Sequence, residues 1–166
     1  ARLALKDYEF RLSPRIQRGA HYCLGIPSPY LRQDDELKAI FIHVPKAAGT
    51  SVRKALYGQK SFHIPAIRYQ VADPDRFRTY FKFCFVRNPW DRMQSAFRYL
   101  HRRVGSNPSF PDHRWATEYL SNLSGFEQFL EKLEKDRSFR GRVRRYIHFR
   151  DQLDWIAEPG ATDRRV

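Results

Sequence analysis

The first stretch that could do chemistry is residues 43–51, His-Val-Pro-Lys-Ala-Ala-Gly-Thr-Ser, which follows a short apolar run. Its small residues let the backbone approach a ligand closely, and a helix starting here offers free N–H groups and a partial positive charge. Two hydroxyls and one mobile cation complete a pattern typical of a phosphate-binding turn. The alternative is an ordinary strand-to-helix turn with a surface lysine. The residues expected to hold the anion are Lys46, Ala47, Ala48, Gly49, Thr50 and Ser51.

The order of residues in this turn differs from the phosphate loop of nucleotide triphosphatases. In that loop the lysine follows the last glycine and directly precedes Ser or Thr, whereas here Lys46 precedes Gly49. No apolar strand ending in a metal-binding aspartate is obvious either. The sequence therefore predicts that the usual machinery for Mg-ATP is absent.

A second pattern lies in residues 85–97, Phe-Val-Arg-Asn-Pro-Trp-Asp-Arg-Met-Gln-Ser-Ala-Phe. Arg87 falls at the end of a predicted strand, where open α/β sheets bind ligands. Ser95 lies about two turns along the helix that follows, so its hydroxyl and the Arg87 guanidinium could close on one phosphate. The alternative is that Arg87 pairs with Asp91 and that Ser95 is merely exposed.

The elements that position these patterns can be read from the apolar residues. Residues 39–44 are a short apolar run typical of a strand buried on both faces, as in a parallel sheet, and residues 80–86 predict a second strand. Residues 52–57 form a short helix closed by Gly58, and a longer helix begins at Pro89. Another helix is expected over residues 126–137, capped by Ser124 or Gly125. On the helix from Pro89, Ser95, Arg98 and Arg102 share one face, and an apolar face comprises Trp90, Met93, Phe97, Leu100 and Val104.

Taken together, the two patterns resemble the PAPS-dependent sulfotransferases, in particular the carbohydrate (heparan/chondroitin-type) family and its bacterial relatives. PAPS is 3′-phosphoadenosine 5′-phosphosulfate. The resemblance is good over residues 39–104 and looser elsewhere. It implies a three-layer α/β/α sandwich with a central, mainly parallel sheet, of the P-loop NTPase-like sulfotransferase fold. We expect a single domain over residues 1–166, with an irregular N-terminal segment over 1–38.

The resemblance also assigns roles to individual residues. Lys46 would contact the transferred sulfuryl group and the bridging oxygen. The loop amides, with Thr50 and Ser51, would hold the 5′-phosphate. Arg87 and Ser95 would hold the 3′-phosphate, the group that distinguishes PAPS from ATP.

His63 is the favoured general base, because a histidine titrates near neutral pH and this one lies between the two patterns. Other family members use glutamate, and a histidine that only caps or packs is the alternative. His148 lies in a His-x-x-x-Gln segment similar to one in the family, where it could contact acceptor or cofactor. No cluster has metal-ligand spacing, so no catalytic metal is expected.

The charge balance points to an anionic partner. The 166 residues contain 31 Lys and Arg against 18 Asp and Glu, a formal net charge of +13. Only a few cations, such as Lys46, Arg87 and Arg92 or one from the basic run 140–150, are needed for one nucleotide. The excess favours an acidic glycan as the hydroxyl-bearing acceptor, with nucleic acid less favoured. The basic run could equally be a solvated helix face.

Two other classes of function stay open at this stage: a metal-dependent nucleotide phosphotransferase, and a non-catalytic module that binds nucleic acid or another polyanion. No apolar run approaches the roughly 20 residues that cross a bilayer. The chain starts at Ala1, which leaves room for an upstream anchor. We expect a cytoplasmic location if the source is bacterial, or the Golgi lumen with a removed anchor if it is eukaryotic. Relatives usually continue with a further strand and helix, so truncation at Val166 is expected.

Overall fold

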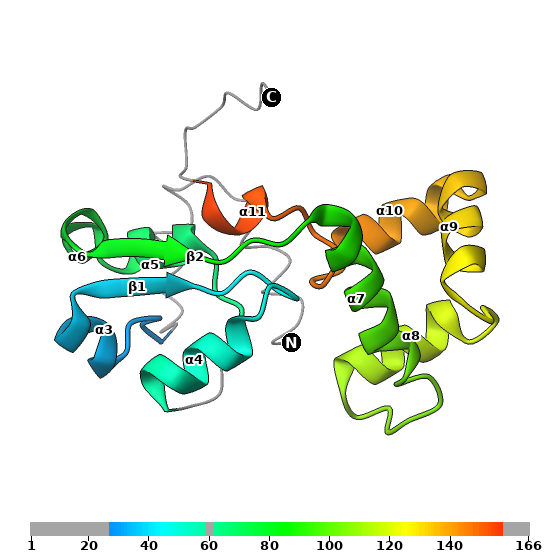
Figure 1. The fold of residues 1–166 in the computed structure, drawn as a ribbon, viewed down its shortest axis with the longest axis horizontal. Coiled ribbons are helices and arrows are strands. Elements are labelled where there is room, and N and C mark those ends of the chain that lie inside the picture. Colours follow the sequence, from blue (N-terminus) through cyan, green and yellow to red (C-terminus); the bar gives the residue numbers. More distant parts are fainter. Residues whose placement is uncertain (1–26, 59–61, 158–166) are drawn as a thin grey trace. The chain divides into compact units, whose positions relative to one another are not determined.

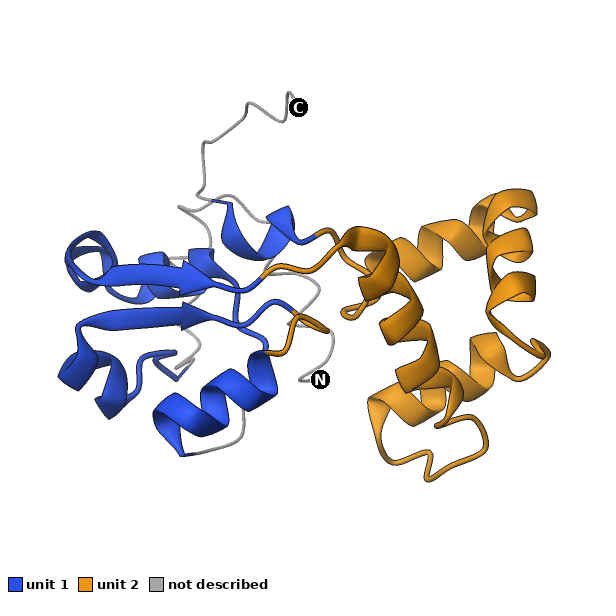
Figure 2. Cartoon of the chain, viewed as in Figure 1, with its two compact units in different colours: residues 1–44, 49–85, 152–166 blue, residues 45–48, 86–151 orange. Residues whose placement is uncertain are grey.

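The computed structural model describes residues 27–58 and 62–157 (Figure 1). The chain divides into two compact units (Figure 2). Unit 1 comprises residues 1–44, 49–85 and 152–166, and unit 2 comprises residues 45–48 and 86–151. Along the chain, the described elements are α3 (Arg32–Leu37), β1 (Ala39–Ile42), α4 (Gly49–Tyr57), α5 (Ala66–Ala72), α6 (Pro74–Thr79), β2 (Phe81–Cys84), α7 (Pro89–His101), α8 (Pro111–Leu120), α9 (Phe126–Lys135), α10 (Arg137–Arg145) and α11 (Leu153–Ile156).

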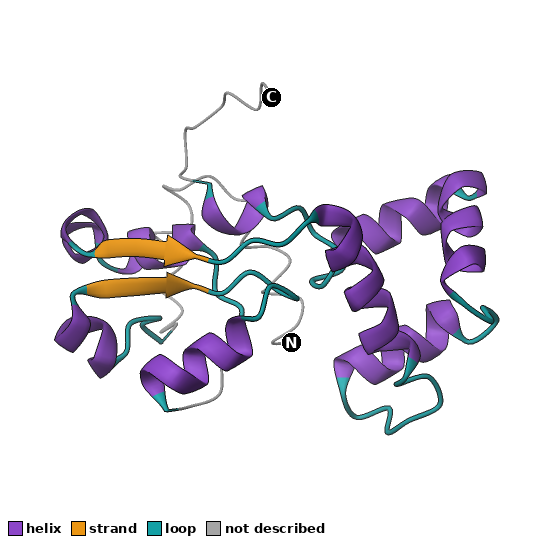
Figure 3. Cartoon of the chain, in the orientation of Figure 1, coloured by secondary structure: helices purple, strands orange, loops and turns teal. Residues whose placement is uncertain are grey.

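The two strands of unit 1 form a small parallel sheet. β1 and β2 lie side by side, with Ala39 opposite Phe81 and Ile42 opposite Cys84 (Figures 1 and 3). The predictions of strands within 39–44 and 80–86, and of their parallel arrangement, are confirmed. The described residues therefore form a mixed, mainly helical structure with a parallel sheet, as expected of an α/β sulfotransferase-type fold. The single domain predicted for residues 1–166 stays a prediction.

α4 follows β1 and starts earlier than expected. It begins at Gly49, three residues before the predicted helix 52–57, so that Thr50 and Ser51 lie in its first turn. Its predicted end is correct: the Gly58 N–H donates to the carbonyl of Lys54 at 3.0 Å, and Gly58 has a φ of 64°. This left-handed conformation is one that glycine adopts without steric cost.

The charged stretch before β1 is a helix, so the prediction of an irregular segment was wrong for residues 32–37. The helix forms because the Asp34 carboxylate accepts a hydrogen bond from the Leu31 N–H at 2.8 Å, which satisfies a donor at the start of α3. Lys38 ends it with a φ of 50°. Residues 1–26, also predicted to be irregular, lie outside the described residues.

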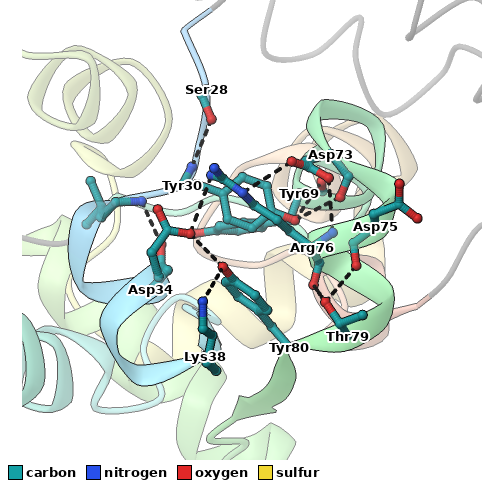
Figure 4. A network of polar contacts seen from close by, with 12 residues as sticks. Ser28, Tyr30, Asp34, Lys38, Tyr69, Asp73, Asp75, Arg76, Thr79 and Tyr80 are labelled. Atoms are coloured by element: carbon teal, nitrogen blue, oxygen red, sulfur yellow. Dashed lines mark hydrogen bonds and ion pairs between the residues drawn. The ribbon is translucent and has the colours of Figure 1, made fainter.

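Hydrogen bonds of two tyrosines connect α3, α5 and the residue before β2 (Figure 4). The Tyr30 hydroxyl lies 3.1 Å from the carbonyl oxygens of both Tyr69 and Asp73, at the end of α5. The Tyr80 hydroxyl donates to Asp35 at 2.7 Å. Because Tyr80 directly precedes β2, these bonds fix α3 and α5 relative to the beginning of that strand.

α7 is the longest helix in the described ranges and supplies much of the core of unit 2. As predicted, it begins at Pro89, and the Asn88 side chain caps it by accepting a hydrogen bond from the Trp90 N–H at 3.0 Å. Phe97 and Leu100 of the predicted apolar face are buried, but Trp90 is 75% exposed. Trp90 was wrongly included because it lies in the first turn, before α7 reaches the buried cluster.

The rest of that core comes from α8 to α10. The helix predicted over 126–137 is confirmed as α9, but it ends at Lys135, two residues earlier than predicted. The Asp136 side chain accepts a hydrogen bond from the Phe139 N–H at 2.9 Å and starts a separate helix, α10. Gly125 precedes α9, as expected. The buried residues of this cluster are Ala96, Phe97, Leu100, Ala116, Leu120, Leu123, Phe129, Phe139, Val143 and Phe149.

Candidate anion-binding site

Unit 2 contains a cavity of about 380 Å³ whose lining is strongly cationic. Five basic side chains line it, against one acid, Asp91. Because these charges are far from balanced within the cavity, it attracts anions. The lining residues are Lys46, Arg87, Asp91, Gln94, Ser95, Arg98, Tyr99, Arg102 and Arg103.

Lys46 reaches the cavity from the segment 45–48. Lys46 and Ala48 have φ values of 65° and 61°, a left-handed conformation that non-glycine residues rarely adopt. Ala47 between them is buried. The Lys46 Nζ lies 4.1 Å from the centre of the Tyr99 ring. An ordinary strand-to-helix turn does not require positive φ at two non-glycine residues. Such backbone strain is typical of functional segments.

The surroundings of Lys46 also change its acidity. Burial lowers the pKa of its ammonium, and the nearby charges of Arg103, Arg102 and Arg87 lower it further. Asp112 acts in the opposite direction, but more weakly. A lysine held in this way gives up its proton more readily than one in water.

Arg87 and Ser95 line the same cavity as Lys46. Arg87 lies in the loop between β2 and α7, and Ser95 lies on α7. Arg98 and Arg102, predicted to share a face of α7 with Ser95, line the cavity too. The structure therefore gathers three of the residues singled out from the sequence, Lys46, Arg87 and Ser95, at one cationic site. Arg103 and Tyr99 were missed, since neither belongs to either sequence pattern.

Tyr99 connects the cavity to a carboxylate on α8. Its hydroxyl donates to Asp112 Oδ2 at 2.8 Å, and the Tyr146 hydroxyl donates to Oδ1 at 2.6 Å. His148 Nε2 lies 3.1 Å from Oδ2. Burial by itself raises the pKa of Asp112, but the hydrogen bond and charge of His148 and the two tyrosine hydroxyls outweigh it and bring the pKa well below its usual range. His148, considered as a contact for acceptor or cofactor, is buried in this cluster.

Arg92, considered as a cation for the nucleotide, has a different environment. It is buried, and its guanidinium donates to the carbonyls of Pro45 and His148 at 3.4 and 3.1 Å, and also to that of Arg150. Burial lowers its pKa, against the charge of Asp151. Arg92 thus satisfies main-chain acceptors of the Lys46 segment and of residues 148–150.

The basic run 140–150 is partly engaged within unit 2. Arg140 donates to the carbonyl of Leu133 at 2.9 Å, and Arg142 donates to the Tyr119 hydroxyl at 3.2 Å. Arg144 is exposed on α10, as a solvated helix face would be. The residues that line the cavity do not include any from this run.

The remaining predicted residues belong to unit 1. Gly49 starts α4, and Thr50 and Ser51 are exposed in its first turn. His63, the favoured general base, packs with its ring centre 4.2 Å from that of His43 and 6.0 Å from that of Trp155. The roles predicted for these residues remain predictions.

In the part of the chain that the structure describes, no group of three or more His, Cys, Asp or Glu side chains could hold a metal ion. The same residues include no helix of the length and apolar character that crossing a membrane requires. The Cys84 thiol is free and half-buried, and burial raises its pKa.

Comparison with known proteins agrees with the resemblance of the two sequence patterns. The model of the sulfotransferase family matches residues 29–163. Since this range is most of the chain, the protein belongs to the sulfotransferase family and is a transferase of sulfuryl groups. Comparisons with curated proteins and with solved structures gave no match.

Proposed function

We propose that this protein transfers the sulfuryl group of PAPS to a hydroxyl of a carbohydrate or similar acceptor, leaving 3′,5′-ADP. The observation that carries the proposal is the cationic cavity of unit 2, which Lys46, Arg87 and Ser95 line together. We further propose that the sheet of unit 1 is part of a three-layer α/β/α sandwich, the arrangement that the sequence patterns imply.

The cavity fits the charge and the hydrogen-bonding needs of such a nucleotide. PAPS carries its negative charge at two separate positions, a 3′-phosphate and a 5′-phosphosulfate. Arg87 can bind a phosphate through two parallel hydrogen bonds, and the Ser95 hydroxyl can donate a third. Lys46 supplies a separate, mobile positive charge for the phosphosulfate. The loop residues Ala47 to Ser51 are proposed to hold the 5′-phosphate.

Transfer then requires positioning and charge neutralisation. In an in-line displacement, the acceptor oxygen forms a bond to sulfur as the bond between sulfur and the bridging oxygen breaks, and the electron pair stays on the 5′-phosphate. Lys46 would stabilise the negative charge that grows on that oxygen. The acceptor hydroxyl must give up its proton, and His63 is our candidate to receive it.

A preference for the 3′-phosphorylated nucleotide tests the donor. Thermal unfolding should shift upward with 3′,5′-ADP and much less with 5′-ADP or with ATP plus Mg²⁺, because only the first has the group that Arg87 and Ser95 bind. Equal shifts with all three nucleotides would contradict PAPS as donor. A larger effect of Mg-ATP would favour the phosphotransferase alternative.

Two variants locate the nucleotide. Arg87→Ala and Ser95→Ala should each reduce the affinity for 3′,5′-ADP, the arginine by about 10-fold or more because a charge-assisted bond is worth about 1.5–3 kcal/mol. The matched control is Arg144→Ala, which removes an exposed arginine of unit 2 that does not line the cavity. The same loss of affinity in Arg87→Ala and Arg144→Ala would show that only the overall charge matters.

Acceptors can be separated by their charge. Wild-type protein and labelled PAPS would be incubated with a neutral glycan, with the same glycan bearing carboxylates, and with RNA as a polyanion without the expected acceptor role. Faster transfer to the acidic glycan is expected, since most of the +13 charge of the chain is not needed for the nucleotide. Faster transfer to the neutral glycan would contradict an acidic acceptor.

A further inference from the structure

Tyr99 is in contact with two cations of the cavity. Its ring centre lies 4.1 Å from the Lys46 Nζ and 3.6 Å from the Arg103 guanidinium carbon. Both distances are well within the range at which the negative face of an aromatic ring attracts a cation. In a partly buried site this attraction is stronger than at an exposed one, because less water competes for the ammonium.

The position of this ring is fixed from its far end. The Tyr99 hydroxyl donates to Asp112 at 2.8 Å, so that a side chain on α7 is tied to the first turn of α8. Asp112 is in turn held by the Tyr146 hydroxyl at 2.6 Å and by His148 Nε2 at 3.1 Å. A carboxylate with three such partners cannot move without breaking hydrogen bonds, and the ring that it holds is correspondingly fixed.

Lys46 needs such a partner more than most lysines do. Its side chain is flexible, and the charges of Arg87, Arg102 and Arg103 repel its ammonium. Repulsion from the cationic side of the cavity would favour conformations in which the ammonium points away. The Tyr99 ring offers an attractive surface that adds no negative charge to the cavity, so it leaves the net positive charge available for an anion.

We infer that Tyr99, oriented by Asp112, is a positioning residue that holds the Lys46 ammonium for sulfuryl transfer. The inference rests on the proposed function of the site. It differs from a purely structural role for Tyr99 in one respect: the effect of changing Tyr99 must act through Lys46. A structural role would lower stability and nucleotide binding whether or not the lysine is present.

Three variants weaken the contact between the Tyr99 ring and the Lys46 ammonium to different extents. Tyr99→Leu removes the ring, whereas Tyr99→Phe and Asp112→Asn keep the ring and weaken its anchoring. We expect kcat to fall by about 3- to 30-fold in Tyr99→Leu, the range that a cation–π contact covers, and by less in the other two. The affinity for 3′,5′-ADP should change little, since Arg87 and Ser95 are intact. Tyr119→Leu, a tyrosine of unit 2 that does not line the cavity, is the matched control.

A double-mutant cycle decides between positioning and structure. In a Lys46→Ala background, Tyr99→Leu should cause no further loss of the residual transfer rate, because the residue through which it acts is gone. Losses that multiply would overturn the inference while leaving the proposed function in place. Folding of each variant is checked by thermal unfolding, and loss of folding in Tyr99→Phe, the mildest change, would also overturn it.

An NMR measurement gives a readout besides activity. In wild-type protein the ring current of Tyr99 should shift the Lys46 Cε protons upfield, and this shift should persist in Tyr99→Phe and disappear in Tyr99→Leu. An unshifted wild-type resonance would overturn the inference. If the shift is present but wild-type protein transfers no sulfuryl group from PAPS, the proposed function fails and the catalytic part of the inference fails with it, although the contact itself stands.

Discussion

The His43 ring fills the space beside the α-carbon of Gly49. A β-carbon at position 49 would lie 1.8 Å from His43 Cδ2 and 2.2 Å from Nε2, far closer than atoms can approach. His43 is buried at the end of β1, and Gly49 begins α4. The sequence suggested that small residues here admit a ligand close to the backbone. In the structure, the glycine is also required for the packing of a buried imidazole within unit 1.

The first prediction follows from this contact. Gly49→Ala should lower the free energy of unfolding by about 1–3 kcal/mol, the usual cost of forcing an extra group into a packed site. Thermal or denaturant unfolding measures the effect. If the His43 ring did not occupy this space, alanine would stabilise α4 by up to about 1 kcal/mol, because alanine favours a helix more than glycine does. The clash and the helix propensity therefore predict opposite signs for the change in the free energy of unfolding.

The control for this prediction is the same change at Gly49 in a variant that lacks the His43 ring. In a His43→Ala background the space is vacated, so Gly49→Ala should become neutral or stabilising. If the glycine variant is equally harmful with and without His43, then the imidazole is not the reason for glycine at this position.

The second prediction concerns the core of unit 2. Phe129 is fully buried, and its ring centre lies 5.0 Å from that of Phe97 and 5.5 Å from that of Phe149. Phe129→Ala should cost about 3–5 kcal/mol, since it removes apolar contacts and leaves a cavity. Leu130→Ala, a partly exposed neighbour on α9, should cost much less. Denaturant unfolding of the two variants checks the difference, and equal losses would contradict the burial pattern.

Much of the candidate site was predictable because the sequence patterns are local. Lys46, Arg87 and Ser95 could be recognised from short stretches with a strand before and a helix after, and the structure places them on one cavity. Tyr99 and Asp112 were not recognised, because their contact joins two helices and depends on tertiary packing. Neither residue type has a fixed spacing from the lysine that a sequence pattern could show.

The errors in the fold have similar causes. Arg32–Leu37 looked irregular because it lacks an apolar face, but Asp34 caps it and makes a short helix stable in its context. The helix predicted over residues 126–137 ends two residues earlier, at Lys135. Asp136 ends that helix, because its side chain accepts a hydrogen bond from the Phe139 N–H and begins α10.

The third prediction concerns the response of stability to acid. Asp112 has a lower pKa in the folded chain than when unfolded, so the unfolded chain takes up the proton first as the pH falls. The stability that the carboxylate contributes is therefore complete above its unfolded pKa of about 3.9 and is lost as the pH falls below that value. Asp112→Asn should cost about 1–3 kcal/mol at neutral pH, with the difference from wild type shrinking in acid.

Unfolding experiments at several pH values check this. The partners that face the carboxylate are Tyr99, Tyr146 and His148, and the tyrosines stay neutral throughout the acid range. Glu127→Gln, an exposed acid of unit 2 outside this cluster, controls for the general effect of losing a carboxylate. A constant difference between wild type and Asp112→Asn from neutral to strongly acidic pH would contradict the lowered pKa.

The fourth prediction concerns the pH dependence of transfer. Burial and the charges of Arg103, Arg102 and Arg87 lower the pKa of Lys46, so its ammonium loses the proton at a lower pH than an ordinary lysine does. Because the charged form is the one that can neutralise the leaving oxygen, kcat/KM should decline on the alkaline side before the usual lysine range. At high salt, which screens the arginines, the decline should move to higher pH.

Arg103→Gln tests the cause of that decline. Arg103 is the strongest of the charges that lower the pKa of Lys46, so removing it should raise this pKa and move the alkaline limb of kcat/KM to higher pH. Arg144→Gln removes an equal charge from the exposed face of α10 and should leave the limb where it is. An alkaline limb that moves equally in both variants would show a response to net charge alone. A limb that moves to lower pH in Arg103→Gln would contradict the role of Lys46 as the titrating group.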